Sequence, residues 1–187
     1  MAIKSFIEND LGKTPFSYIF STKDRSNLEI YFKLKDKYEY RFQNEEFEEL
    51  KTKILNEFGS YDLVIIPETK GRYLKIIAES LSHNVISVSK RCKTDILADL
   101  EQQKMMKNER QSLFNVLENM DVIQINKIKG NQRKRFRDIL FEKLDFTEWN
   151  DKKVLLLDDS VFSGETLIAL KESINIDCEI KVIFSKF

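Results

Sequence analysis

The chain contains few of the residues that mark special classes of protein. Its 187 residues include two cysteines, two prolines, five glycines and one histidine. Cys92 and Cys178 stand alone, without a C-x-x-C pair or a neighbouring histidine, so the sequence indicates neither a disulfide framework nor a zinc site. The scarcity of proline and glycine excludes a disordered or linker-rich chain.

Net charge and long apolar runs are also missing. The 31 lysines and arginines equal the 31 aspartates and glutamates, so no overall charge draws the chain to nucleic acid or a membrane. No apolar run has the length of a membrane span, and the first residues lack a signal-peptide pattern. With 42% hydrophobic residues, the composition predicts a globular protein. The unpaired cysteines fit a reducing cytoplasm, and we expect no membrane contact.

Short apolar segments alternate with segments of helical periodicity. This alternation predicts βαβ units, and we expect an α/β fold with a mainly parallel open sheet and helices on both faces. The expected strands are 62–67, 84–89, 122–128, 154–157 and 180–184. The expected helices are 44–58, 73–82, helical segments within 94–120, one around 136–144 and one after residue 166.

Residues 16–42 show a two-residue alternation that predicts β structure. The apolar positions of the clearest strand are Leu28, Ile30, Phe32 and Leu34. A turn at 36–37 would lead into a second strand at 38–42, forming a hairpin. We expect a single domain over 1–187, with a hairpin-and-helix hood in 1–60, a core in 61–187 and a helical insertion at about 92–150.

The most informative stretch is Val154–Leu167, which reads VLLLDDSVFSGETL. An apolar run of strand length ends in two adjacent acids, which can accept hydrogen bonds from two vicinal hydroxyls. A Ser-Gly-x-Thr loop then opens a helix, where free backbone N–H groups can bind a phosphate. Ligands of open α/β sheets bind outside the carboxyl ends of the strands, so the stretch predicts recognition of a sugar phosphate.

This stretch resembles the phosphoribosyl-pyrophosphate (PRPP) motif of type I phosphoribosyltransferases in the order of its residues. The resemblance implies the fold of that family, and it implies that Asp158 and Asp159 hold the ribose hydroxyls and a Mg²⁺ ion. It also implies a loop around the 5′-phosphate. The residues of that loop are Phe162, Ser163, Gly164, Glu165 and Thr166. Without the resemblance, the same residues could form a buried strand, a polar turn and a capped helix.

Two positions depart from the family pattern. Phe162 stands where members that use 6-oxopurines carry an acid, which disfavours hypoxanthine or guanine as the acceptor. Glu165 places a carboxylate beside the phosphate loop, and this is tolerable if the side chain points outward from the start of the helix. Neither departure removes the predicted site.

Two basic segments are candidates for binding the pyrophosphate of PRPP. Lys70-Gly71-Arg72 follows the first core strand, where the family has its pyrophosphate loop, so two cations would neutralise the leaving group. Lys90 and Arg91 follow the next strand and resemble a basic pair that family members use on the same diphosphate. The alternative for both segments is an ordinary solvated turn.

The segment between these strands and the motif is long and highly charged. Residues 108–115 resemble a Glu-Arg…Asn segment of competence-associated phosphoribosyltransferase-like proteins. The most basic patch, Lys127–Arg137, has a turn expected at 130–131. This patch fits a lid over the pyrophosphate, a nucleic-acid contact or a solvated helix start, and the sequence leaves all three open.

Taken with the resemblance, these residues predict PRPP-dependent transfer of phosphoribose to a nitrogen acceptor such as a nucleobase, with Mg²⁺ and release of pyrophosphate. Asp158, Asp159, Lys70 and Arg72 would be the catalytic residues. The alternative is a non-catalytic regulator that binds PRPP or a nucleotide and acts on a protein or nucleic-acid partner. The sequence leaves open whether the chain forms a homodimer, and it does not identify the acceptor.

Overall fold

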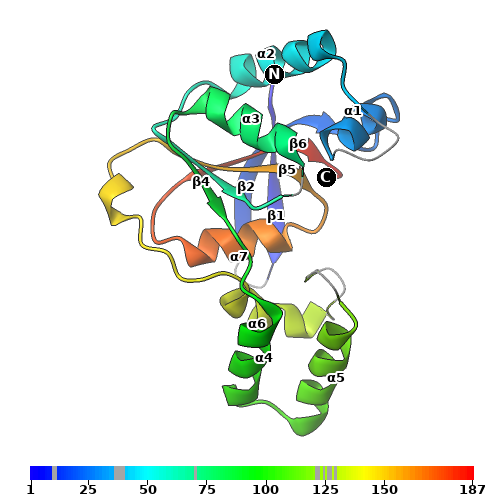
Figure 1. Cartoon of the computed structure of the whole chain (residues 1–187), viewed down its shortest axis with the longest axis vertical. Coiled ribbons are helices and arrows are strands. Elements are labelled where there is room, and N and C mark those ends of the chain that lie inside the picture. Colours follow the sequence, from blue (N-terminus) through cyan, green and yellow to red (C-terminus); the bar gives the residue numbers. More distant parts are fainter. Residues whose placement is uncertain are drawn as a thin grey trace. The chain divides into compact units, whose positions relative to one another are not determined.

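A computed structural model of the chain contains one six-stranded sheet (Figure 1). The structure describes residues 1–9, 12–35, 41–69, 71–120, 123, 125, 128 and 130–187, with backbone only at 9, 130–131 and 134–135. Within this part of the chain, no helix is long and apolar enough to cross a membrane.

The strands run in the order β1-β2-β6-β5-β3-β4 across the sheet. β1 is antiparallel to β2, and every other neighbouring pair is parallel. The strands are β1 (Ile3–Asn9), β2 (Gly12–Ser21), β3 (Leu63–Pro67), β4 (Val85–Val88), β5 (Val154–Val161) and β6 (Glu179–Ser185). The prediction of an α/β chain with a mainly parallel sheet is therefore confirmed.

The chain divides into two compact units. The first consists of 1–88, 146–164 and 176–187 and contains the whole sheet. The second consists of 89–145 and 165–175. Each unit has its own buried apolar residues.

In the first unit, helices α2 (Asn44–Phe58) and α3 (Arg72–Leu81) lie side by side over one face of the sheet (Figure 1). Both present apolar residues at helical spacing to that face, as the sequence predicts. Removing each such Leu or Ile from water contributes about 1.5–3 kcal/mol. The buried residues include Phe47, Leu50, Ile54 and Phe58 of α2, Leu74, Ile77 and Leu81 of α3, and Leu155 and Leu157 of β5.

The second unit is helical. Its helices are α4 (Lys93–Gln102), α5 (Lys107–Glu118), α6 (Gly130–Leu140) and α7 (Glu165–Ser173). Phe136 and Phe141 are fully buried, and a single bridge pairs Leu144 with Ile174. The predicted helical character of 94–120 is confirmed by α4 and α5.

The predicted strand over 28–34 is wrong, because this segment is helix α1 (Ser26–Leu34). The Asp24 carboxylate accepts hydrogen bonds from the Ser26 backbone N–H at 3.0 Å and from its hydroxyl at 2.8 Å, which favours a helix start. Ile30, Tyr31 and Leu34 then face the core at helical spacing. The error came from counting Tyr31 as a polar, outward residue. The predicted turn and strand at 36–42 lie mostly outside the described residues, and described residues 41–42 are not in a strand.

The structure differs from the sequence-based expectations in three smaller points. β1 was not predicted, although it forms an antiparallel hairpin with β2. Of the predicted strand 122–128, the described residues Ile123, Ile125 and Ile128 are buried but lie outside any strand. The turn expected at 130–131 is instead the first turn of α6.

Candidate functional site

Asp158 and Asp159 lie inside β5, close to its carboxyl end. The sequence predicts that the strand ends at 157, but β5 continues to Val161 because β6 pairs with it as far as Val161 and Ser185. Neighbouring residues of a strand point to opposite faces, so the two carboxylates leave β5 on different sides. A ligand that contacts both must therefore bind across the edge of the sheet, where β5 ends.

Asp159 is buried, with 3% of its surface exposed. Its Oδ1 accepts hydrogen bonds from the Lys35 ammonium at 2.6 Å and from the Ser160 hydroxyl at 2.7 Å. A buried carboxylate is tolerated only when such partners compensate for the lost hydration. Asp158 is half-buried, and its Oδ1 accepts the backbone N–H of Asp159 at 2.8 Å.

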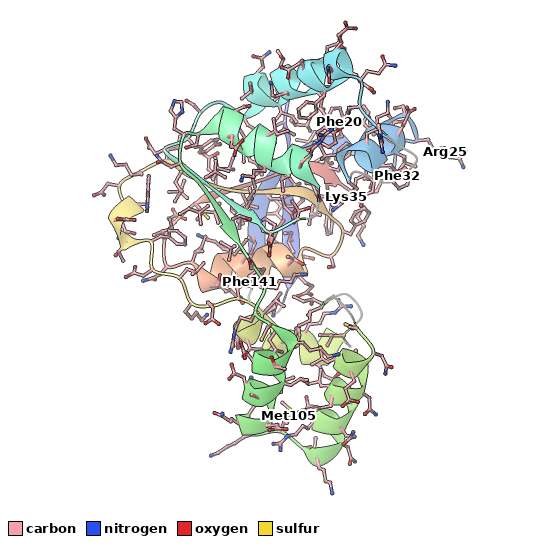
Figure 2. All side chains as sticks on the ribbon, in the orientation of Figure 1. Phe20, Arg25, Phe32, Lys35, Met105 and Phe141 are labelled. Carbon is pink, nitrogen blue, oxygen red and sulfur yellow. The ribbon has the colours of Figure 1, made fainter. Side chains whose placement is uncertain are left out.

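Lys35 follows the last turn of α1. Its ammonium reaches the carboxylate of Asp159, whereas Arg25 at the other end of α1 points into solvent (Figure 2). Burial lowers the pKa of Lys35, but the charge and hydrogen bond of Asp159 and the charge of Asp158 outweigh it, so the pKa lies above its ordinary value. Lys35 is therefore a protonated cation directly beside the predicted ribose-binding acids.

Aromatic side chains connect α1 to the loop that follows β5. The ring of Tyr31 lies 5.7 Å from that of Phe162 and 5.5 Å from that of Phe184, both edge-on. Burial raises the pKa of Tyr31, and the charge of Asp159 raises it further, although Lys35 and Ser160 oppose the shift. Phe162 keeps 41% of its surface exposed, so the start of the predicted phosphate loop presents an aromatic face to solvent.

Gly164 is a position that only glycine fits. Its φ of +76° lies in the left-handed region, which side chains avoid. A Cβ at this position would lie 2.5 Å from Cγ2 of Ile7, a buried residue of β1. The glycine of the Ser-Gly-x-Thr motif therefore packs against the N-terminal hairpin while it turns the chain toward α7.

The predicted pyrophosphate loop borders the same helix. A Cβ on Gly71 would lie 3.2 Å from the carbonyl oxygen of Leu34, so the small residue allows this loop to pack against the end of α1. Arg72 begins α3, is exposed and donates a hydrogen bond to the Tyr73 hydroxyl at 3.2 Å. Lys70, the other predicted catalytic cation, lies outside the described residues.

The last two residues of the predicted phosphate loop, Glu165 and Thr166, open α7 in the second unit. Glu165 does not point outward as the sequence analysis required: its side chain is 14% exposed. It lies 3.4 Å from the guanidinium of Arg137 and 3.7 Å from that of Arg133, both on α6. These two arginines compensate its charge within the unit. Thr166 is half-buried.

Lys90 and Arg91 contact groups of the second unit. The Lys90 ammonium donates to the carbonyl oxygen of Ile123 at 2.9 Å. The Arg91 guanidinium binds Asp99 and Glu142, and these contacts raise its pKa, with the Asp99 hydrogen bond the main cause. Arg91 therefore has a structural role that the sequence analysis did not foresee.

The basic patch is also more structural than its composition indicates. Arg137 is buried, and Arg133 donates to the carbonyl oxygen of Ile128 at 2.9 Å. Both therefore contribute to the packing of α6 and α7, in contrast to the solvated helix start considered above. Residues 127 and 129 and the side chains of 134 and 135 are outside the part of the chain that the structure describes.

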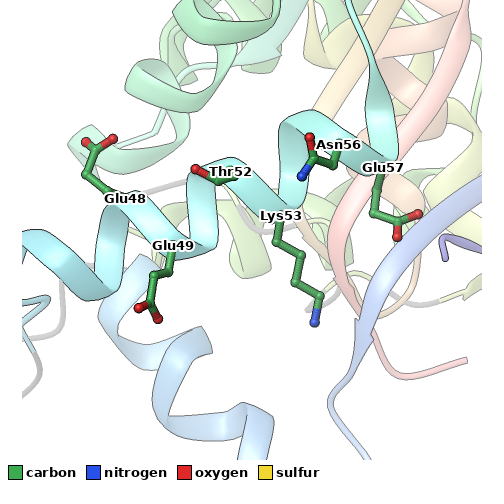
Figure 3. A pocket seen from close by; sticks show the side chains of 6 residues that line it. All are labelled: Glu48, Glu49, Thr52, Lys53, Asn56 and Glu57. Atoms are coloured by element: carbon green, nitrogen blue, oxygen red, sulfur yellow. The ribbon is translucent and has the colours of Figure 1, made fainter.

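A depression lies on the exposed side of α2 (Figure 3), with a volume of about 510 Å³. It is lined by Glu48, Glu49, Thr52, Lys53, Asn56 and Glu57. All six belong to one helix and are polar, whereas small-molecule sites are mostly apolar and concave. We interpret this depression as solvated helix surface.

Sequence analysis missed Lys35 and Tyr31, which belong to the candidate site. A helical interpretation of 26–34 would have placed Tyr31 on the inner face, but Lys35 carries no local signal. Among the described residues, no group of three or more His, Cys, Asp or Glu side chains is arranged to hold a metal ion.

No family model matches the chain, no curated protein matches it, and no solved structure matches its fold. The motif and the geometry described above are therefore the observations from which a function is proposed.

Gly164→Ala should destabilise the protein more than Gly59→Ala. Both glycines have a positive φ, but a Cβ at Gly59 meets nothing within 4 Å. We expect Gly59→Ala to cost about 1–3 kcal/mol for the backbone conformation alone. Gly164→Ala should cost about 1–3 kcal/mol more, because its Cβ overlaps Ile7. Urea unfolding measures both, and the extra loss should shrink in an Ile7→Ala background. Equal losses in the two variants would contradict this packing.

Lys35→Met should lower the free energy of unfolding by about 2–4 kcal/mol, since it leaves the buried Asp159 carboxylate without its cation. Lys75→Met on α3, which removes a pair that is more than half exposed, should cost less than about 1 kcal/mol. Adding Asp159→Asn to Lys35→Met should recover most of the loss. Chemical unfolding of the four proteins provides the test, and a loss no larger than that of Lys75→Met would refute the buried pair.

The pH dependence of the same variants reports on the charge. Because the pKa of Lys35 is raised in the folded state, the charge of Lys35 stabilises the fold fully below the ordinary lysine pKa of 10.5. This stabilisation is lost as the pH rises through the raised pKa. The difference in stability between wild type and Lys35→Met should therefore be constant at neutral pH and shrink above pH 10.5.

Proposed function

We propose that this chain binds PRPP together with Mg²⁺ and transfers the phosphoribosyl group to a nitrogen acceptor, releasing pyrophosphate. One observation carries the proposal: the ordered motif Val154–Leu167 lies on a strand flanked by parallel neighbours, with a left-handed glycine between that strand and a helix. This arrangement supports a sugar-phosphate site at the carboxyl edge of a type I phosphoribosyltransferase fold.

The ribose and the metal are assigned to Asp158 and Asp159. Lys35 and Ser160 both bond to Oδ1 of Asp159, so we assign its Oδ2 to a ribose hydroxyl. Mg²⁺ is usually held by one or two carboxylates plus substrate phosphates, and a pair of aspartates fits that requirement without a larger protein cluster. When bound, the ion would screen the negative charge of the diphosphate.

The 5′-phosphate is assigned to residues 162–166, where Ser163, Thr166 and the backbone N–H groups that open α7 offer donors. In the reaction, the bond from the ribose C1 to the pyrophosphate oxygen breaks while C1 becomes cationic. The acceptor nitrogen then bonds to C1 and loses its proton. Lys70 and Arg72 are assigned to the leaving pyrophosphate, whose charge they would stabilise.

The alternative is a non-catalytic regulator that binds PRPP or a nucleotide, and two observations favour it. Asp159 is almost fully buried and already bound by Lys35, so a ligand must share it with a cation of the chain. Arg91 forms ion pairs with Asp99 and Glu142, so its charge is already neutralised. This leaves fewer of the predicted cations to assist the leaving pyrophosphate. Binding with little turnover would fit these features.

The binding assignment predicts which variants lose which ligand. Asp158→Asn should weaken PRPP and a nucleoside 5′-monophosphate alike, because both contain the ribose. Arg72→Ala should weaken PRPP and pyrophosphate by roughly 2–3 kcal/mol and leave the monophosphate nearly unchanged. Lys75→Ala, one turn further along α3, is the matched control. Calorimetry in the presence of Mg²⁺ measures the three affinities. An equal loss of affinity for all three ligands in Arg72→Ala would show that residues 68–72 do not form the pyrophosphate site.

Turnover separates the enzyme from the regulator. An enzyme should release pyrophosphate from PRPP faster with some nucleobase or amine than without an acceptor, and Arg72→Ala should then lower kcat as well as affinity. A regulator should bind PRPP without acceptor-dependent release. Absence of PRPP binding in the presence of Mg²⁺ would reject both functions.

A further inference from the structure

The outer edge of β1 has the features of a surface that pairs with another strand. β1 is the outermost strand at one side of the sheet, and β2 is its one neighbour in the described part of the chain. It has seven residues, and two of its large apolar side chains are exposed: Ile3 at 47% and Phe6 at 54%. A long edge strand with exposed apolar residues is a template for pairing with another chain.

Pro15 decides which backbone groups point to that edge. Phe6 lies opposite Pro15 in the β1–β2 register, and proline has no N–H to exchange with its partner. The Phe6–Pro15 pair is therefore a non-hydrogen-bonded one, so the N–H and C=O of Phe6 point away from β2. By the two-residue period, the backbone groups of Lys4 and Glu8 also point outward.

The side chains of the same three residues are self-complementary. Lys4, Phe6 and Glu8 share one face of β1 and are exposed. In an antiparallel pair of two β1 strands centred on Phe6, Phe6 meets Phe6, and each Lys4 lies opposite the Glu8 of the other copy. Glu8 also pairs with Lys13 of β2 in its own chain at 3.0 Å, so in the junction its carboxylate would lie between Lys13 and the Lys4 of the other copy. Edge strands usually carry charges that repel a second copy, whereas Lys4 and Glu8 attract one. A groove of about 300 Å³ adjoins Phe6 on this face.

We propose that the chain forms a two-fold homodimer in which β1 pairs antiparallel with β1 of a second copy, centred on Phe6. The two sheets then join into one sheet of twice the width. Lys4, Phe6 and Glu8 of both copies make the hydrogen-bonded positions of the junction. The dimer is independent of the proposed transferase activity, because it uses no residue of the PRPP site.

Charge exchange provides the first test. Lys4→Glu alone places an acid opposite the Glu8 of the other copy, and Glu8→Lys alone places a cation opposite its Lys4. Each variant should therefore weaken dimerisation about tenfold or more, because like charges then face each other across the junction. An equimolar mixture of the two variants should form a heterodimer, because every cross-strand pair is then of opposite charge.

Light scattering and sedimentation measure the mass of each sample, and circular dichroism shows whether each variant is folded. Wild type that stays monomeric at roughly 100 μM, where even a weak dimer of micromolar Kd would form, would overturn the proposal. A mixture of the two folded charge variants that stays monomeric would overturn it as well.

Disulfide trapping tests the register even if a charge variant fails to fold. In a chain with Cys92→Ser and Cys178→Ser, Phe6→Cys places two cysteines directly opposite at about 5.5 Å between Cα atoms, within disulfide range. Glu8→Cys is the matched control, because its two copies lie roughly 14 Å apart along the strands. Oxidation should crosslink Phe6→Cys and a mixture of Lys4→Cys with Glu8→Cys, but not Glu8→Cys alone. Crosslinking of Glu8→Cys alone would show a different register and overturn the proposal.

Discussion

The ion pair between Lys35 and Asp159 is the interaction on which the candidate site depends. It joins residues 124 positions apart at 2.6 Å and attaches the end of α1 to the carboxyl end of β5. Asp159 can be buried there only because Lys35 and Ser160 replace its hydration. With α1 held in place, Tyr31 reaches Phe162, and Gly71 packs against the carbonyl of Leu34. The first helix of the chain therefore forms a wall of the site.

The second unit repeats the same principle at the other end of the motif. Glu165 opens α7, where its charge would repel a phosphate, but Arg133 and Arg137 of α6 lie against it. Two acids of the motif, Asp159 and Glu165, are thus paired with cations of the chain itself. If a sugar phosphate binds here, binding is an exchange of ionic partners. The affinity then depends on how much stronger the ligand's charge-assisted contacts are than the internal ones they displace.

Local patterns predicted most elements, and the failures have identifiable causes. α2 and α3 were predictable because their apolar residues recur at helical spacing and bury one face. α1 was not, because five of its nine residues are aliphatic or aromatic and their spacing satisfies both strand and helix periods. The end of β5 was misjudged because two aspartates look like a strand end, whereas pairing with β6 extends the strand beyond them. Strand pairing depends on two segments, so the sequence of one segment alone does not predict where a paired strand ends.

The sequence by itself determined the α/β alternation and the ordered motif Val154–Leu167, because both depend on neighbouring residues and on the geometry of a strand, a turn and a helix. Only the tertiary structure decided the strand order, the contact of Gly164 with Ile7 and the partners of Asp159 and Glu165. The physical reason is combinatorial. With 31 basic and 31 acidic residues in the chain, any carboxylate has many candidate cations, and only the folded backbone brings one within hydrogen-bonding distance.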